Sequence, residues 1–385
     1  MTDDAHAGGS AGEPTGPHER RRERAAERLE AVGAAGLVAF PSRNLQYLTG
    51  FAEEPGERHF FLVIPASSAT EPEPALLAPA LYETQVREAT TVGEVRTWND
   101  GDDPVAATRE LLADRGLDAG RLLVDDTMWA RFTQDLRAAA PDATWGLASE
   151  ALADLRVRKD EAELAALREA AAVADGVVDD LRELGADAVG MTEAALADWI
   201  AERLAERGGR GVSFETVVAA GENGAKPHHG HGDREIRAGE PVVLDFGTRV
   251  DGYPSDQTRT LAFGGEPSEA YAEVHQVVRE AQAAGVEAVE PGVPAAAVDR
   301  AAREVIEAAG YGDAFVHRTG HGVGLDVHEE PYLVAGNDRP LEPGMVCSVE
   351  PGIYLDGRFG CRIEDLVVVT EDGCERLNRT GRGWA

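Results

Sequence analysis

Two stretches rich in β-branched residues, each interrupted by an Asp-Gly pair, constrain this chain more than any other feature. The first covers residues 242–260 and turns at Asp251-Gly252, and the second covers residues 345–369 and turns at Asp356-Gly357. Runs of this kind, broken at Asp-Gly, are typical of antiparallel β-hairpins. The sequence therefore predicts two hairpins in the C-terminal half of the chain.

Each predicted hairpin carries two carboxylates that mirror each other about its turn. Asp245 and Asp256 flank the first turn, and Glu350 and Glu364 flank the second. We expect the two acids of each pair to lie roughly opposite each other, about 4.5–5.5 Å apart, where like charges are destabilising. The pattern therefore predicts a cation between them.

The two hairpins resemble each other, which indicates an internal duplication. A shift of 105 positions superposes Asp245 on Glu350 and Gly247 on Gly352. Two segments with helical signals precede each hairpin, at residues 160–184, 192–208, 269–289 and 295–309. Two helices and a hairpin, repeated once, predict an α+β domain with a mostly antiparallel sheet. If the halves face each other, the four carboxylates converge.

Four carboxylates in apolar strand contexts favour a metal site over a solvated acidic face. For a single acid in so acidic a chain, a solvated position is the more common case. Buried carboxylates are too costly to keep unless they are paired or bind a metal, and no lysine lies close to them in sequence. An oxygen-rich site with one imidazole suits two divalent ions such as Mn, Co or Zn.

Histidines gather beside the predicted hairpins. Most of the chain's ten histidines lie within residues 221–231 and 317–329. A lone histidine is more often a core or surface residue than a functional one. Two clusters beside acidic hairpins instead favour a role in chemistry.

The N-terminal part of the chain has a different composition. Residues 1–18, rich in Gly, Pro and acidic residues, predict a disordered acidic tail. Residues 19–150 alternate helical and strand-like runs, which predicts a smaller α/β domain. It holds no dense cluster of histidines or acids, so we assign it to substrate access and subunit contact and expect a homodimer. Residues 151–385 then form the α+β domain.

The charge of the chain argues against one class of partner. The formal net charge is −33, and of the 37 basic residues only Lys159 and Lys226 are lysines. We therefore expect no nucleic-acid partner. So much acid with so little lysine indicates adaptation to a high-salt cytoplasm, where screening relieves self-repulsion. The alternative is a high-GC genome, which would explain the preference for arginine but not the excess of acid.

Other features indicate the compartment. Three cysteines are too few for a disulfide framework and favour a reducing cytoplasm. The N-terminus lacks the apolar stretch of a signal peptide. No run approaches the roughly 20 apolar residues that cross a bilayer. We therefore expect a cytoplasmic protein with no membrane partner.

These motifs together resemble the pita-bread metallopeptidases, specifically the branch of aminopeptidase P, prolidase and creatinase. The resemblance rests on the eleven-residue spacing of Asp245 and Asp256, on His321 in "TGHGVGL", on Glu350 in "EPGIY" and on Glu364 in "RIED". Upstream, "NLQYLTGF" resembles the accessory N-terminal domain of the same branch. Methionine aminopeptidases share the catalytic fold but lack that domain, so they are disfavoured.

The resemblance implies a dinuclear metal centre with five protein ligands. Asp256 and Glu364 would bridge the two ions, Asp245 would chelate one, and His321 with Glu350 would bind the other. Manganese is the first choice of metal, with cobalt or zinc as alternatives. Creatinase keeps this fold without the metal ligands, whereas all five ligand positions are filled here.

The resemblance also implies roles for residues around the metals. Glu350 would carry a proton from the attacking water to the leaving nitrogen, His228 would contact the substrate, and His328 would stabilise the tetrahedral intermediate. His317 and Arg362 would orient this network. An equally good interpretation of Arg362 is charge neutralisation of Glu364 and Asp365. Neither His229 nor His231 receives a role.

The expected function is hydrolysis of the peptide bond between an N-terminal residue and proline. The expected substrates are small peptides with proline in second position, either dipeptides or longer peptides. A broad metalloaminopeptidase is one alternative. A non-catalytic peptide-binding protein that keeps its metal for stability is another.

Overall fold

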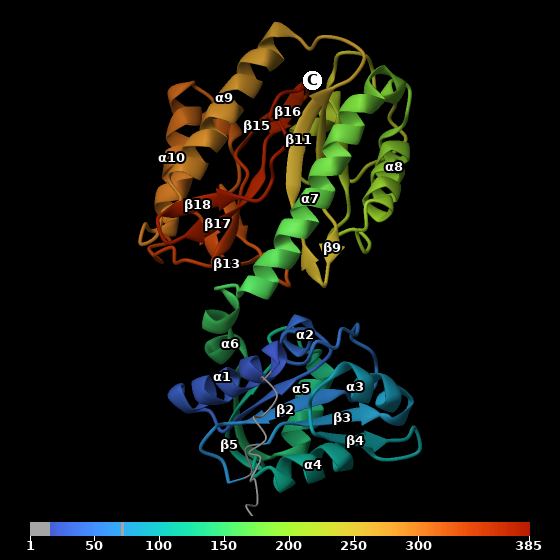
Figure 1. Ribbon diagram of the computed structural model, residues 1–385, viewed down its shortest axis with the longest axis vertical. Helices are drawn as coiled ribbons and strands as arrows, with labels where there is room; N and C mark the ends of the chain where they lie inside the picture. The colour runs from blue at the N-terminus through green and yellow to red at the C-terminus, as the bar shows by residue number, and fades with distance from the viewer. Residues whose placement is uncertain (1–15, 71–72) are drawn as a thin grey trace, which may run out of the picture. The chain divides into compact units, whose positions relative to one another are not determined.

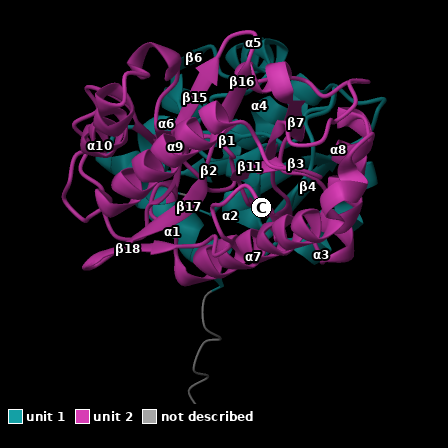
Figure 2. Ribbon diagram, turned by 90° about the horizontal axis from the view of Figure 1, so that it is seen from above, with its two compact units in different colours: residues 1–155 teal, residues 156–385 magenta. Residues whose placement is uncertain are grey.

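The computed structural model describes residues 16–70 and 73–385, which divide into two compact units, Met1–Leu155 and Arg156–Ala385 (Figures 1 and 2). The tail expected over residues 1–18 lies mostly outside the described residues. Helix α1 (Pro17–Ala31) begins two residues before residue 19, where the α/β domain was expected to start. Proline is favoured in the first helical turn because its missing N–H would have no partner there.

The first unit is built on a six-stranded mixed sheet. The strand order is β4-β3-β2-β1-β5-β6, with β1 antiparallel to β2 and parallel to β5. The strands are β1 (Gly36–Ala39), β2 (Phe61–Pro65), β3 (Ala75–Pro79), β4 (Glu94–Trp98), β5 (Ala119–Val124) and β6 (Asp142–Leu147). The other helices are α2 (Arg43–Thr49), α3 (Glu83–Ala89), α4 (Pro104–Asp114), α5 (Ala130–Ala139) and α6 (Ser149–Arg156). The predicted α/β domain is confirmed.

The second unit repeats two helices and a hairpin, as predicted. Its helices are α7 (Glu161–Leu184), α8 (Glu193–Glu206), α9 (Glu269–Glu287) and α10 (Ala295–Ala308). Helix α7 starts at a capping box, in which Asp160 accepts from the backbone of Glu163 and the Glu163 side chain accepts from the backbone of Asp160. The hydroxyl of Thr192 caps α8 as expected. Figure 1 shows α7 and α8 beside the strands of the first half, and α9 and α10 beside those of the second.

Every strand pair in the second unit is antiparallel. The first half contains β7 (Val217–Ala220), β8 (Pro241–Phe246), β9 (Arg249–Val250), β10 (Tyr253–Pro254) and β11 (Gln257–Ala262). The second contains β12 (Gly320–Gly322), β13 (Glu329–Leu333), β14 (Val346–Val349), β15 (Gly352–Leu355), β16 (Phe359–Arg362), β17 (Asp365–Thr370) and β18 (Gly373–Arg376). Each hairpin is therefore interrupted and consists of two strand pairs. These are β8–β11 and β9–β10 in the first hairpin, and β14–β17 and β15–β16 in the second.

The acids lie at or beside these breaks, and only the second hairpin has the predicted register. Val349 faces Asp365 and Gly352 faces Arg362, which places Glu350 opposite Glu364. In the first hairpin Asp245 faces Thr258, so the expectation that it faces Asp256 is wrong by two residues.

The turn explains this shift of register. Val250 pairs with Tyr253 and encloses a two-residue loop in which Asp251 and Gly252 both have positive φ, at 48° and 87°. This is the backbone of a type I′ turn, whose centre falls between those two residues. The mirror relation between the acids would have required the centre one residue earlier.

Each half has its own hydrophobic core between its helices and its hairpin. In the first half, Val177 of α7 and Ile200 of α8 pack with Leu244 of β8. In the second, Val278 of α9 and Ile306 of α10 pack with buried side chains of the second hairpin. Each fully buried aliphatic side chain contributes about 1.5–3 kcal/mol, which fixes the position of each hairpin against its helices.

The returning strands of the two hairpins meet. The backbone N–H of Glu364 donates to the carbonyl of Thr258 at 3.1 Å, and the hydroxyl of Thr260 donates to the carbonyl of Arg362 at 2.9 Å. The acids of both hairpins therefore lie close together.

Cys347, Cys361 and Cys374 are free. Among the described helices, none is long and apolar enough to span a membrane.

Candidate metal centre

A cavity of about 660 Å³ in the second unit is lined by all nine site residues that the sequence predicts. They come from both halves of the duplication. They are Asp245, Asp256, His321, Glu350, Glu364, His228, His328, His317 and Arg362.

Three overlapping groups of ligand atoms lie in this cavity, each with all atoms within 4.8 Å of one another. One joins Asp245, Asp256 and Glu364, and a second joins His321, Glu350 and Glu364. Together these two groups contain the five expected ligands. Asp256, Glu364 and His321 each belong to two of the three groups. Of these, Asp256 and Glu364 are the carboxylates that the family resemblance assigns to the bridging positions.

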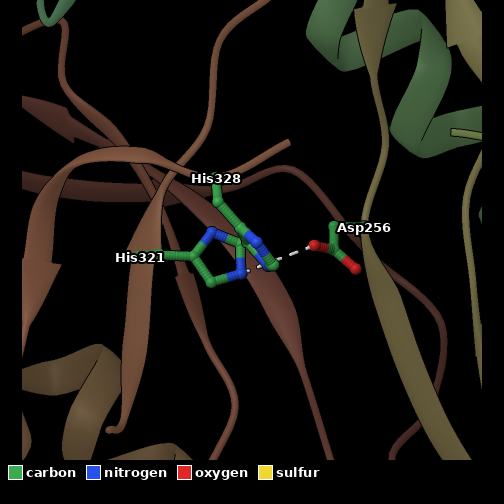
Figure 3. A group of neighbouring side chains, drawn as sticks. All are labelled: Asp256, His321 and His328. Atoms are coloured by element: carbon green, nitrogen blue, oxygen red, sulfur yellow. Dashed lines mark ion pairs between the residues drawn. The ribbon is translucent and has the colours of Figure 1, made fainter. Parts of the chain in front are cut away.

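The third group brings His328 beside Asp256 and His321 (Figure 3). The Nε2 atom of His321 lies 3.7 Å from Asp256 and 3.3 Å from Glu350, and its ring lies edge to face with that of His328, with centroids 4.0 Å apart. Its Nδ1 lies 3.1 Å from the carbonyl oxygen of Gly322. This contact sets the tautomer and leaves Nε2 available to a metal.

Burial and mutual repulsion perturb the carboxylates strongly. Burial, followed by the charges of the other acids, raises the pKa of Asp256 and Glu364 well above their usual values. Burial also raises the pKa of Asp245, although Arg362 opposes the shift. At Glu350 burial acts in the same direction, but the hydrogen bond and charge of His321 and the charges of His317 and Arg362 lower the pKa to about 2.

The donor set fits divalent metal ions. Oδ1 of Asp245 and Oε1 of Glu364 are buried, and within the described part of the chain no group donates a hydrogen bond to either. Unpartnered carboxylate oxygens at such depth are costly. Four carboxylates with one imidazole therefore match two oxygen-preferring divalent ions better than they match any protein partner among the described residues.

Arg362 is the protein cation of this centre. It forms an ion pair with Asp245 and donates to the hydroxyl of Tyr354 at 2.9 Å, which in turn lies 2.9 Å from Nε2 of His317. His317 and Arg362 thus belong to one hydrogen-bonded chain, through a tyrosine that sequence reasoning missed.

The alternative interpretation of Arg362, charge neutralisation of Glu364 and Asp365, fails only for Asp365, because the charge of Arg362 still opposes the rise in the pKa of Glu364. Asp365 is fully buried and is paired with two other arginines, Arg259 at 2.7 Å and Arg376 at 2.7 Å. The two neighbouring carboxylates therefore have different surroundings. Glu364 lines the cavity, whereas Asp365 lies outside the cavity lining and is held by its two arginines.

His228 lies on a loop that a buried acid holds in place. The carboxylate of Glu193 is fully buried and accepts from the backbone of Ala220 at 2.8 Å and the amide of Asn223 at 3.0 Å. It also lies 2.9 Å from Nε2 of His229, which the sequence left without a role. Glu193 was missed because nothing near it in sequence suggests this contact.

A second buried cluster holds the segment that carries His328. The ammonium of Lys159, whose side chain is fully buried, lies 2.6 Å from the carboxylate of Glu329. Arg156 contacts the other oxygen of Glu329 at 2.9 Å and Asp326 at 2.7 Å. One of the chain's two lysines therefore forms a buried ion pair with the residue next to His328.

Replacing Lys159 by methionine tests this contact. Lys159→Met keeps the aliphatic stem but leaves Glu329 with Arg156 as its remaining ion-pair partner. We expect the free energy of unfolding to fall by about 3 kcal/mol, the lower end of what a broken buried pair costs. The matched control is Lys226→Met, at the exposed second lysine, with an expected change within about 0.5 kcal/mol. Equal losses in denaturant titrations of the two variants would contradict the assignment.

Removing the metal should make stability depend on pH in a defined direction. Without metal, Asp256 and Glu364 keep their protons to higher pH in the folded state than in the unfolded chain. Their contribution to stability is therefore complete below about pH 4 and is lost as pH rises through the raised pKa values. We expect the thermal midpoint of chelated protein to fall from about pH 5 to about pH 8, and added Mn²⁺ to restore it.

Calorimetry of chelated and metal-loaded samples checks this expectation. The metal-loaded protein is the control, because bound ions keep the ligands ionised throughout that range. If both samples lose stability by the same amount, these carboxylates do not form a metal centre.

Comparison with known proteins agrees with this geometry. Residues 165–371 match metallopeptidase family M24, and residues 21–158 match the creatinase/prolidase N-terminal domain. A protein named probable dipeptidase PepE from Mycobacterium tuberculosis H37Rv is 44% identical over 363 residues, which cover 93% of this chain and 94% of that protein. The Xaa-Pro dipeptidase of Lactobacillus delbrueckii subsp. lactis is 38% identical over 344 residues, 88% of this chain and 91% of that protein.

A solved structure shares the fold. The prolidase from Thermococcus sibiricus matches with a TM-score of 0.89 at 38% identity, over 96% of this chain and 99% of that structure. The resemblance to the aminopeptidase P and prolidase branch is confirmed, and with it the pita-bread fold of the second unit. The chain belongs to metallopeptidase family M24, carries a creatinase/prolidase N-terminal domain, and is a hydrolase.

Proposed function

We propose that this protein is an Xaa-Pro dipeptidase that depends on two divalent metal ions. The observation that carries the proposal is a cavity in which all five ligand positions are filled and brought together. A relative named Xaa-Pro dipeptidase matches nearly the whole chain, both units included. Manganese is our first choice of metal because the donors are mostly carboxylate oxygens.

The side chains around the centre supply what the hydrolysis of an Xaa-Pro bond needs. Divalent ions held by the five ligands would lower the pKa of a bound water and polarise the scissile carbonyl. Glu350 then accepts the proton of the attacking water. The nitrogen of proline carries no hydrogen in the peptide bond and must gain one to leave, so Glu350 passes that proton to it.

We assign to two histidines the role of stabilising the negative charge that develops on the carbonyl oxygen. His228 and His328 both line the cavity. Desolvation and the nearby His321 lower the pKa of His328 to about 4, so its imidazole is neutral at neutral pH. A neutral imidazole still donates one N–H, and a donor aimed at the oxyanion is worth more in the transition state than in the ground state.

Arg318 favours a dipeptide over a longer peptide. It lines the same cavity, its guanidinium stacks 4.3 Å from the ring centroid of Tyr332, and in the described residues no carboxylate forms an ion pair with it. Arg362, the other arginine of the lining, is paired with Asp245. Arg318 is thus the cation available to the free carboxylate of a dipeptide, which a longer peptide does not present next to proline.

A panel of substrates tests the proposal. With Mn²⁺ present, we expect cleavage of Ala-Pro, little cleavage of Ala-Pro-Ala and none of Ala-Ala-Ala. Preference for Ala-Pro-Ala would indicate an aminopeptidase P, and cleavage of Ala-Ala-Ala a broad aminopeptidase. Absence of turnover with Mn²⁺, Co²⁺ or Zn²⁺ would instead support the non-catalytic alternative.

The role of Arg318 is tested with the same assay. We expect Arg318→Ala to raise KM for Ala-Pro by about tenfold, because a charge-assisted hydrogen bond of about 1.5–3 kcal/mol is lost. KM for Ala-Pro amide, which has no carboxylate, should stay unchanged. Arg300→Ala, at an exposed arginine of α10, is the matched control. Equal effects on both substrates would remove Arg318 from substrate recognition.

We propose a cytoplasmic location and a high-salt environment on the grounds of charge. Because Lys159 is buried, Lys226 is the one lysine at the surface of the described residues. The surface therefore has little flexible positive charge to offset a net charge of −33. The homodimer expected from the sequence stays a prediction that light scattering would test.

The salt dependence of stability follows from this charge. At about 0.01 M salt the Debye length is about 30 Å and most surface carboxylates repel one another, whereas at about 1 M it is about 3 Å and only close neighbours interact. We expect the thermal midpoint and the activity to rise together from low salt toward molar KCl with Mn²⁺ saturating. A midpoint that is flat or falls would leave genome composition as the explanation of the arginine preference.

A further inference from the structure

A second cavity in the Arg156–Ala385 unit is unusual for so acidic a chain, because arginines line it. It measures about 440 Å³ and lies where the C-terminal segment passes α9. Its charged lining consists of one carboxylate, Glu280, and four arginines. These are Arg279, Arg376, Arg379 and Arg382.

The arginines have few acidic partners of their own. Arg376 pairs with Asp365 at 2.7 Å, but its Nε is buried without a hydrogen-bond partner among the described residues. Arg279 and Arg382 donate to the neutral side chains of Gln276 and Gln282. Within residues 16–70 and 73–385, no carboxylate forms an ion pair with Arg279, Arg379 or Arg382.

The cluster is therefore positively charged and repels itself. Burial and the charges of neighbouring arginines, led by Arg376, lower the pKa of Arg382. In a chain that carries 70 acidic residues, the three guanidinium groups without an ion pair could readily have been given carboxylate partners. Their convergence on an open cavity instead leaves positive charge free for an anion from solution.

We propose that this cavity binds a multiply charged phosphate, either inorganic phosphate or a phosphorylated small molecule. The guanidinium group presents paired N–H donors that match phosphate oxygens in a bidentate way, and it stays charged at any physiological pH. Arg279 and Arg379 are exposed, so the ligand can enter from solvent and meet the more buried Arg376 and Arg382 beyond them. The cavity volume lies in the range of small-molecule sites.

The anion site is connected to the metal centre through buried side chains. Arg382 reaches Gln282, whose amide donates to Asp365 at 2.9 Å. Asp365 also accepts from Arg259 at 2.7 Å, and Arg259 donates to the backbone carbonyl of Glu364 at 2.6 Å. A phosphate that attracts Arg376 or Arg382 would therefore change the hydrogen bonds directly behind a proposed metal ligand.

Isothermal titration calorimetry on the metal-loaded full-length protein tests the site, with inorganic phosphate and fructose 1,6-bisphosphate as probes at constant ionic strength. The test variant is Arg279→Ala/Arg379→Ala, because both side chains are exposed and neither supports a buried group. The matched control is Arg237→Ala/Arg300→Ala, two exposed arginines outside the cavity. Both variants remove two positive charges, so any general electrostatic effect is equal.

We expect saturable binding to wild type and to the control, and binding at least about tenfold weaker to the test variant. If all three proteins bind equally, the phosphate is held elsewhere, for example at the metals, and the proposal is overturned. Absence of saturable binding to wild type overturns it as well. Thermal midpoints of both variants, measured without phosphate, show that each is folded.

Discussion

Mutual repulsion among buried carboxylates is the interaction on which the rest of this structure depends. Asp245, Asp256, Glu350 and Glu364 line one cavity, and two of them have an oxygen that accepts no hydrogen bond from the described residues. One protein cation, Arg362, pairs directly with one of the four acids. The remaining charge must be balanced by ions or by retained protons. The hydrophobic cores behind each hairpin hold the acids together in spite of this cost.

The breaks in the hairpins are what let the acids converge. The second hairpin changes from β14 to β15 at Glu350-Pro351, where proline cannot donate to a strand ladder. At Gly360 a Cβ would collide with the carbonyl oxygen of Gly224, so only glycine lets strand β16 approach the loop that leads to His228. The cavity of the candidate metal centre thus exists because regular strand pairing stops where the acids lie.

Local signals in the sequence were sufficient to predict the helices and hairpins of the second unit and the convergence of the four acids. Alternating and helical periodicity predicted the repeated helix-helix-hairpin order, and the motifs around Asp245 and Glu364 predicted which acids meet. The register of the first hairpin was not predictable from symmetry, because the type I′ geometry at Asp251 decided it.

Partners that lie far apart in the sequence could not be predicted from it either. The cation that pairs with Asp245 is an arginine 117 residues away in the chain, so the residues near Asp245 in sequence do not indicate it. Lys159 and Glu329 are 170 residues apart, and Glu193 precedes His229 by 36. Only the folded chain creates these contacts, and each of them supports a segment that lines the metal-centre cavity.

A few basic residues of this chain lie inside the molecule and form specific ion pairs there. Lys159, Arg259 and Arg362 are all buried and each pairs with a particular acid. Buried pairs are screened much less than exposed ones, so salt should act on the surface carboxylates and leave these pairs in place. Bound metal ions would instead act on the carboxylates of the cavity, whose repulsion salt screens only weakly. The metal and the high salt that we propose this protein needs would therefore have separate physical origins: the ions would relieve repulsion inside one cavity, and salt would relieve repulsion over the whole surface.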